Sequence, residues 1–162
     1  MIPESVQTIW QAYGAETSRD RSADFYEPFH FHDNEQGALE LAQLVLAGVK
    51  RGTASLVWTY EHDQKRPPWI GCLSVMTDWH GTPLGIIETS KIEAVPFEEV
   101  AAEFAAIEGE GDKSLHYWSE GHWNYFTREC KRIGRIPDRR MLVLCEQFEL
   151  VYTLPRNFKV RA

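Results

Sequence analysis

Hydrophobic residues recur at helical spacing in four parts of the chain and predict four helices. These helices are expected over residues 6–13, 34–47, 96–107 and 112–133. Gly14 is the expected end of the first helix, and Asn34 is a suitable cap for the second. Pro96 suits the first turn of the third helix, and Asp112 suits the cap of the fourth.

Other apolar runs are rich in β-branched residues and predict strands. They cover residues 55–60, 71–79, 84–95 and 141–153. The pattern does not decide where the first run ends and a short helix begins. The turn H-G-T-P between the next two runs predicts that they form an antiparallel pair. Polar residues 15–24 and the proline-closed segment 61–68 are expected connections. The order of elements predicts an α+β fold around a small, mostly antiparallel sheet or barrel.

Composition narrows the class of protein without defining an activity. The 162 residues are 43% hydrophobic and carry a net charge of −7, which fits one globular domain and disfavours broad wrapping of nucleic acid. Three widely spaced cysteines without a C-x-x-C motif predict a reducing, cytoplasmic setting. The chain start lacks the features of a signal peptide, and no apolar run is long enough for a membrane span.

The stretch A-G-V-K-R-G-T-A-S, residues 47–55, is the strongest candidate site. Gly48 is placed to end a helix in the left-handed conformation, and Gly52 would allow a second tight turn. Lys50, Thr53 and Ser55 would then be presented by a constrained backbone. A plainer interpretation is that Lys50 only complements the dipole of the preceding helix.

Two charged segments are candidates to face this stretch. The glycine-rich loop 108–112 carries the carboxylates of Glu108, Glu110 and Asp112. The simpler interpretation of Glu110 and Asp112 is that they are a solvated loop residue and a helix cap. Six of the 17 Lys and Arg residues fall within 13 positions: Arg128, Lys131, Arg132, Arg135, Arg139 and Arg140. This cluster could bind RNA or form a solvated helix face.

Aromatic and histidine residues add weaker signals. Trp118 could be a core residue or a platform for single-stranded RNA. His30 and His32 would share one face of an extended segment and could bind a metal together. However, no third ligand is evident nearby, and histidines in aromatic loops more often bind no metal.

Three segments together resemble the ASCH domain family. They are G-V-K-R-G-T-A-S after an A-x-x-V-L-A helix, I-E-T-S-K-I-E-x-V-P-F, and A-E-F-A-x-x-E-G-E-G-D-x-S-L-x-Y-W. The similarity runs from about residue 25 to residue 153. It implies a PUA-like β-barrel, mostly antiparallel, with surrounding helices and an added N-terminal helix. The expected organisation is an N-terminal helix and connection (1–24), the ASCH domain (25–153) and a C-terminal tail (154–162).

The resemblance also implies a function directed at RNA or a modified nucleoside. Small members of the superfamily hydrolyse acetylated cytidine with a lysine base, a threonine nucleophile and a glutamate acid, which match Lys50, Thr53 and Glu108. A lysine acts as a base only where its site favours the neutral amine, and a glutamate acts as an acid only when protonated. The amidohydrolase reaction requires no cofactor. This chain is considerably longer than those compact enzymes, so its cleft could suit another substrate.

Two alternatives stay open. One is a ribonuclease of single-stranded RNA, either without a metal or assisted by a divalent metal, for which His122 and the acidic loop supply the candidate residues. The other is a module that only binds RNA. For substrate or RNA binding, the candidate residues are Gly48, Ser55, Arg128, Lys131, Arg132, Trp118 and His122. Neither DNA nor a membrane is an expected partner, and the sequence identifies no metal ligand set.

Overall fold

One five-stranded sheet, in the order β1-β3-β4-β5-β2, carries the fold in the computed structural model, which describes residues 2–155. The strands are β1 (Phe25–Phe29), β2 (Gly52–Leu56), β3 (Leu73–Thr77), β4 (Pro83–Pro96) and β5 (Leu142–Tyr152). All neighbours pair antiparallel except β1 and β3, which are parallel. The α+β class is therefore confirmed, but the sheet is mixed. The barrel is not confirmed, because no pairing joins the edge strands β1 and β2 within residues 2–155.

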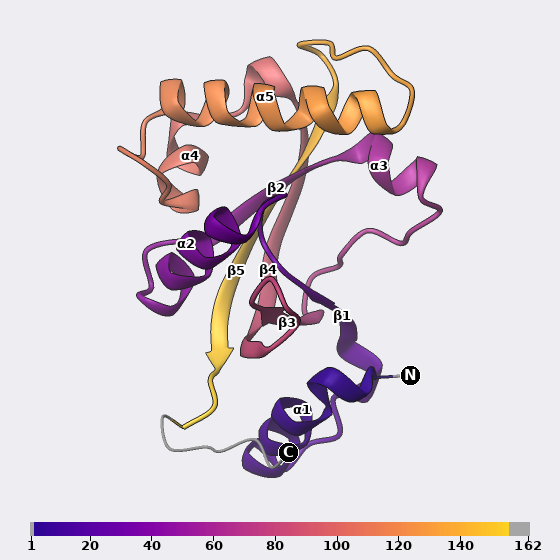
Figure 1. The fold of residues 1–162 in the computed structure, drawn as a ribbon, viewed down its shortest axis with the longest axis vertical. Helices are drawn as coiled ribbons and strands as arrows, with labels where there is room; N and C mark the ends of the chain where they lie inside the picture. The colour runs from indigo at the N-terminus through magenta and orange to yellow at the C-terminus, as the bar shows by residue number, and fades with distance from the viewer. Residues whose placement is uncertain (1, 156–162) are drawn as a thin grey trace.

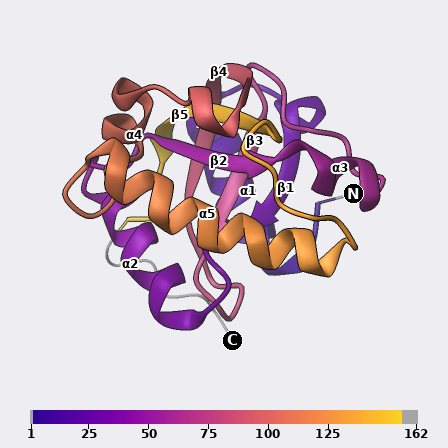
Figure 2. The same ribbon diagram turned by 90° about the horizontal axis from the view of Figure 1, so that it is seen from above.

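Five α-helices pack around the sheet. They are α1 (Glu4–Thr17), α2 (Glu35–Leu46), α3 (Val57–His62), α4 (Ala102–Glu108) and α5 (Leu115–Arg132), with short 3₁₀ turns at Ser22–Asp24 and Phe97–Glu99. Figures 1 and 2 show α5 lying across one end of the long strands, whereas α1 lies at the opposite end. Long β4 and β5 connect the two ends and give the molecule its length.

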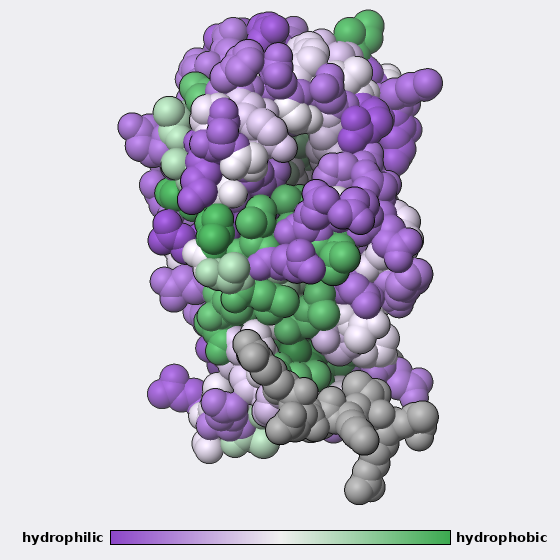
Figure 3. All heavy atoms as spheres, turned by 60° about the vertical axis from the view of Figure 1, so that its left-hand side comes forward, coloured by the Kyte–Doolittle hydropathy of each residue, from purple (hydrophilic) through white to green (hydrophobic). Residues whose placement is uncertain are grey.

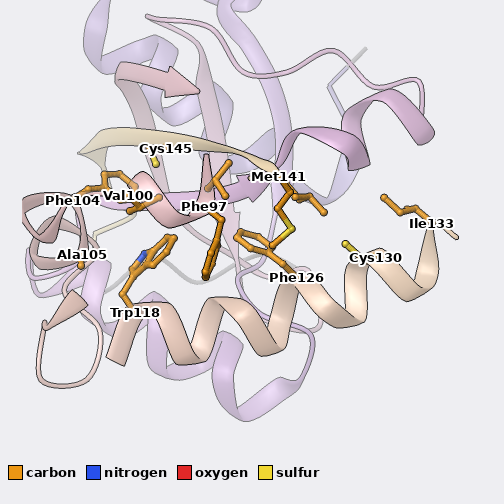
Figure 4. Packing of buried hydrophobic residues seen from close by; sticks show 12 residues of the cluster. Phe97, Val100, Phe104, Ala105, Trp118, Phe126, Cys130, Ile133, Met141 and Cys145 are labelled. Carbon is orange, nitrogen blue, oxygen red and sulfur yellow. The ribbon is translucent and has the colours of Figure 1, made fainter. Parts of the chain in front are cut away.

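Three apolar clusters fix these helices to the sheet. The largest lies beneath α5 and includes Phe97, Trp118, Phe126 and Met141, whose side chains converge between α5 and the strands in Figure 4. A second cluster joins α1 to β3 and β4, and a third joins α2 to β3, β4 and β5. Each buried aromatic contributes roughly 1.5–3 kcal/mol through removal of apolar area from water. The α5 cluster therefore anchors the helix that supplies part of the site.

The apolar residues of α2 are only partly buried. Ala42 and Val45 are buried, but Leu39 and Leu46 are about half exposed at 45% and 43%. Figure 3, in which the left-hand side of Figure 1 is turned towards the viewer, shows hydrophobic residues gathered in a patch on this face of the molecule. No helix within residues 2–155 has both the length and the apolar character needed to cross a membrane.

Two predicted elements begin or end elsewhere because tertiary contacts override local signals. Pro96 ends β4 instead of opening a helix, since β4 stays paired with β5 as far as Leu142. Gly14 does not end α1, which continues to Thr17. The cap of α5 is Ser114, whose hydroxyl accepts the backbone N–H of Tyr117 at 3.0 Å, and not Asp112.

The remaining corrections concern strands. Phe25–Phe29 is not among the predicted strands, yet it forms edge strand β1. Gly52 is not in a turn but begins β2 opposite Gln147. The run 57–60 is helical, so the strand-like segment ends at Leu56. The predicted tail from residue 156 onward lies outside the described residues.

Candidate functional site

Lys50 is buried at the junction between α2 and β2. Gly48 has a φ of 74°, which confirms the left-handed end predicted for this helix. The backbone N–H groups of Val49 and Lys50 then both donate to the carbonyl of Leu44, at 2.9 and 3.1 Å. This short connection aims Lys50 inward, where its side chain is only 1% exposed.

The Lys50 ammonium contacts two carboxylates, one at the end of α4 and one in the loop that follows it. Its Nζ donates to Glu108 Oε1 at 3.1 Å and to Glu110 Oε1 at 2.7 Å. Gly109 between them has a φ of 70°, and a Cβ there would lie 2.4 Å from the carbonyl oxygen of Val49. Only glycine therefore allows the carboxylate loop to approach the lysine segment this closely.

Glu108 is held by α5 as well as by Lys50. Its Oε2 accepts the indole N–H of Trp118 and lies 3.1 Å from His122 Nε2. The His122 ring stacks on Trp118 at 4.1 Å, and its Nδ1 lies 2.9 Å from the Trp118 carbonyl. Trp118 and His122 are one turn apart on α5, so the helix presents both groups to the same carboxylate.

The charges of this cluster define its resting protonation. Burial opposes ionisation of Lys50, but Glu108 and Glu110 outweigh burial and raise the lysine pKa above its usual value. Burial likewise opposes ionisation of Glu108, yet Lys50 and His122 lower its pKa to about 2. The resting pair is thus ammonium and carboxylate, the opposite of the neutral amine and protonated acid that the base and acid roles require.

The stability of the protein should depend on pH through His122. Burial lowers the His122 pKa, but the charge and hydrogen bond of Glu108 overcome this and raise it above 6.5. A raised folded-state pKa adds stability that is complete below about pH 6.5 and is lost as pH rises through the folded pKa. We expect the free energy of unfolding in urea to fall across this window in the wild type but not in His122→Gln.

His116→Gln is the matched control, because His116 is on the same helix with a side chain 82% exposed. It should keep the wild-type pH profile. A wild-type free energy of unfolding that stays flat, or rises, as pH increases above about 6.5 would contradict the assigned ion pair.

A cavity of about 410 Å³ opens beside this charge cluster. Thr53 and Ser55 line it together with Lys50, Glu108 and His122. Thr53 and Ser55 lie on the same face of β2 because alternate residues of a strand share a face. No hydrogen-bond partner of the Thr53 hydroxyl occurs in residues 2–155, so it is available for a ligand, whereas the Ser55 hydroxyl lies 2.9 Å from that of Tyr60.

The other predicted site residues do not all reach the cavity. Gly48 shapes the turn, and Trp118 is buried behind Glu108. Arg128 lines the cavity but pairs with Asp33 at 2.7 Å. Arg132 pairs with Asp63 at 2.9 Å, and neither it nor Lys131 lines the cavity.

The basic cluster is therefore not a free cationic face. Besides Arg128 and Arg132, Arg135 lies 3.5 Å from Glu61, and Arg140 lies 3.1 Å from Glu98. These exposed pairs add little stability individually, but they neutralise much of the positive charge.

No set of three or more metal-type ligands is grouped anywhere in residues 2–155. His30 and His32 both line the cavity wall, and His32 Nδ1 also accepts the backbone N–H of Asp33 at 2.9 Å. The Lys50 ammonium occupies the place between Glu108 and Glu110 that a cation would take. The two carboxylates thus already have a positive partner.

Sequence reasoning missed two acidic residues of the site. Glu110, read as a solvated loop residue, has a side chain only 22% exposed against Lys50. Glu146 on β5 also lines the cavity and is 8% exposed. Its signal was a lone carboxylate within the apolar run L-V-L-C-E-Q-F, which marks a buried polar group that needs a partner.

Fold and site together define a small α+β domain with a buried lysine–carboxylate cluster at a ligand-sized cavity. The chain belongs to the ASCH domain family, whose model matches residues 27–152. It is similar to the ASCH domain of Lactobacillus crispatus JV V101, with 37% identity, a TM-score of 0.86, and coverage of 93% of this chain and 96% of that one. A protein of Enterococcus faecalis V583 is 30% identical with a TM-score of 0.84, covering 91% of this chain and 88% of its own. No curated protein matches the chain.

Proposed function

We propose that this protein is a hydrolase that removes the acyl group from the exocyclic amine of an N-acylated cytidine. Membership in the ASCH domain family supports an RNA-related function. The observation that carries the narrower proposal is the meeting of Lys50, Thr53 and Glu108 at one cavity. These residues are separated by up to 58 positions in the chain, yet all three line the same 410 Å³ space.

The size and walls of the cavity favour a small ligand over a long RNA strand. Its volume falls within the usual range for small-molecule sites. Tyr60 and Tyr125 supply aromatic surface, and hydroxyl groups such as that of Thr53 supply hydrogen bonds. The arginines on α5 and just after it are paired with carboxylates, so they offer few free cations for successive phosphates, which a strand-binding groove would need.

In the proposed reaction, Thr53 Oγ attacks the acyl carbon and its proton passes to Lys50. The carbon–nitrogen bond then breaks, and the departing amine takes a proton from Glu108. Water hydrolyses the acyl-threonine, which releases the carboxylic acid and restores the hydroxyl. The products are cytidine and the free acid, so one water is consumed in each cycle.

The resting ion pair holds the protons that these steps need. Transfer of one proton along the 3.1 Å contact from Lys50 Nζ to Glu108 Oε1 gives a neutral amine and a carboxylic acid without any exchange with solvent. A ligand that excludes water favours this neutral form, because charges are costly in a desolvated site. We infer that substrate binding shifts the pair towards the reactive form.

The direct test is release of acid from a panel of N-acylated cytidines, measured with purified wild-type protein and with Lys50→Ala. We expect turnover by the wild type and none by the variant. Absence of turnover across the panel would refute the proposal. If the protein instead cleaves single-stranded RNA, and this cleavage is lost in Lys50→Ala and inhibited by a chelator, the protein is a ribonuclease. Salt-sensitive RNA binding without product formation would indicate a binding module.

A further inference from the structure

Glu146 is a buried carboxyl group at the cavity that the proposed reaction does not use. It lies on β5 directly opposite Thr53 on β2. Side chains of directly opposed residues in an antiparallel pair lie on the same face, with Cβ atoms about 4.5–5.5 Å apart. Glu146 and the proposed nucleophile therefore enter the cavity side by side.

One oxygen of Glu146 is fixed and the other is free for a ligand. Oε1 accepts the hydroxyl of Thr89 at 2.5 Å, and that hydroxyl lies 3.3 Å from Cys72 Sγ. Oε2 has no hydrogen-bond partner in residues 2–155. Every fully buried side-chain oxygen of the described residues has a hydrogen-bond partner. Oε2 is therefore not fully buried, and it is exposed to the cavity that Glu146 lines.

The surroundings of Glu146 raise its pKa above the usual value. Burial is the largest cause; the hydrogen bond from Thr89 opposes it, the charge of Glu27 adds to it, and Lys65 lowers the pKa slightly. Lys65 pairs with Glu27, and no ion pair of Glu146 with a cation occurs within residues 2–155. When Glu146 is protonated, Oε1 accepts from Thr89, so the proton lies on Oε2, which then faces the cavity as a donor.

We propose that Glu146 is the specificity-determining residue of this cavity and reads the Watson–Crick edge of the base through a neutral carboxyl group. In the neutral carboxyl, Oε2–H is the donor, and Oε1 is the neighbouring acceptor because it has a second lone pair besides the one that accepts from Thr89. Cytosine offers the complementary pair, because its N3 accepts and its exocyclic N4–H donates. Guanine presents this pair in the reverse order, with the O6 acceptor in place of N4–H and the N1–H donor in place of N3, so a carboxyl group held in one orientation by Thr89 would disfavour it.

This inference rests on the proposed function for the identity of the ligand, and it also explains a feature of that function. A cytosine held by Glu146 through N3 and N4–H has its exocyclic nitrogen close to Thr53, because the two side chains are neighbours across the strands. The acyl group on that nitrogen then lies beside the nucleophile. Base recognition and the reacting bond are thus set by one strand pair.

The test is equilibrium binding of cytidine and guanosine to Glu146→Gln and Glu146→Ala between about pH 5 and pH 8. Glutamine keeps an acceptor for Thr89 and turns an N–H donor to the cavity, so Glu146→Gln should bind cytidine within about threefold of wild type at low pH. Glu146→Ala should lose at least about tenfold. Glu149→Gln, on the exposed face of the same strand, is the control and should match wild type.

The pH profile separates recognition from a merely structural role. Wild-type affinity for cytidine should fall as pH rises through the pKa of Glu146, whereas Glu146→Gln should lack that component. His122 titrates at the same cavity, and Glu27, Lys65, Tyr26 and Tyr60 also face this end of it, so the difference between wild type and Glu146→Gln is the quantity to compare.

The possible results divide cleanly between the two proposals. Equal cytidine affinity in wild type and a folded Glu146→Ala, or equal affinity for guanosine and cytidine, overturns the role of Glu146 even if acyl-cytidine is hydrolysed. Glu146-dependent cytidine binding without hydrolysis sustains this inference and refutes the reaction. Absence of any nucleoside binding by the wild type overturns the role of Glu146, whatever the hydrolysis assay shows.

Discussion

Replacing Lys50 with methionine should lower the free energy of unfolding by about 3–5 kcal/mol. The change removes the positive partner of two carboxylates and leaves Glu108 buried with an uncompensated charge. The apolar part of the side chain is largely kept, so packing loss is a small part of the effect. Urea unfolding at neutral pH would measure it.

Two further variants identify the cause of this loss. Lys91→Met removes a lysine whose side chain is 54% exposed and pairs with Glu93 at the surface, so it should cost at most about 1 kcal/mol. Combining Lys50→Met with Glu108→Gln removes the stranded buried charge and should cost less than the sum of the single changes. Strict additivity, or a loss under about 1 kcal/mol for Lys50→Met, would show that the pair is not the buried ionic contact described above.

Replacing Thr53 with valine should reduce kcat for acyl-cytidine hydrolysis by at least about a thousandfold. Valine has nearly the shape of threonine but no hydroxyl, so the acyl-enzyme cannot form. The Thr53 hydroxyl has no hydrogen-bond partner in residues 2–155, and the fold should lose little stability. Single-turnover kinetics with separate measurement of cytidine binding would distinguish lost chemistry from lost affinity.

Ser55→Ala provides the matched comparison on the same strand face. It removes a hydroxyl that lines the same cavity but lies beside Tyr60, and it should change kcat by less than about tenfold. The reverse result, with an active Thr53→Val and an inactive Ser55→Ala, would move the nucleophile to Ser55. Full activity in both would exclude a hydroxyl nucleophile from β2.

Local pattern was enough to predict the segment that carries Lys50. The Asn34 cap is observed, because its side chain accepts the backbone N–H of Gly37 at 2.8 Å. The left-handed Gly48 is also observed. Both features depend on neighbouring residues alone. The long strands β4 and β5 were also predictable, because apolar and β-branched residues recur along each of them. The α+β class and the family were predictable for the same reason.

Elements that depend on distant partners were not predictable. Strand β1 contains Pro28 and no alternation, and it exists because it pairs in parallel with β3 almost fifty residues later. Pro96 favours a helix start locally, yet its place opposite Leu142 keeps it in β4. In both cases the pairing partner outweighs the local preference.

The site divides in the same way. The sequence by itself determined that Lys50 would follow a tight helix end, and that Thr53 would stand three residues later. Only the tertiary structure decided that Glu110 and His122 join Glu108 around this lysine and that Glu146 lies beside Thr53. It also decided the charge states, because a pKa depends on burial and on charges brought together from distant parts of the chain. Residue spacing specifies a conformation, but it does not specify the electric environment that tertiary packing creates.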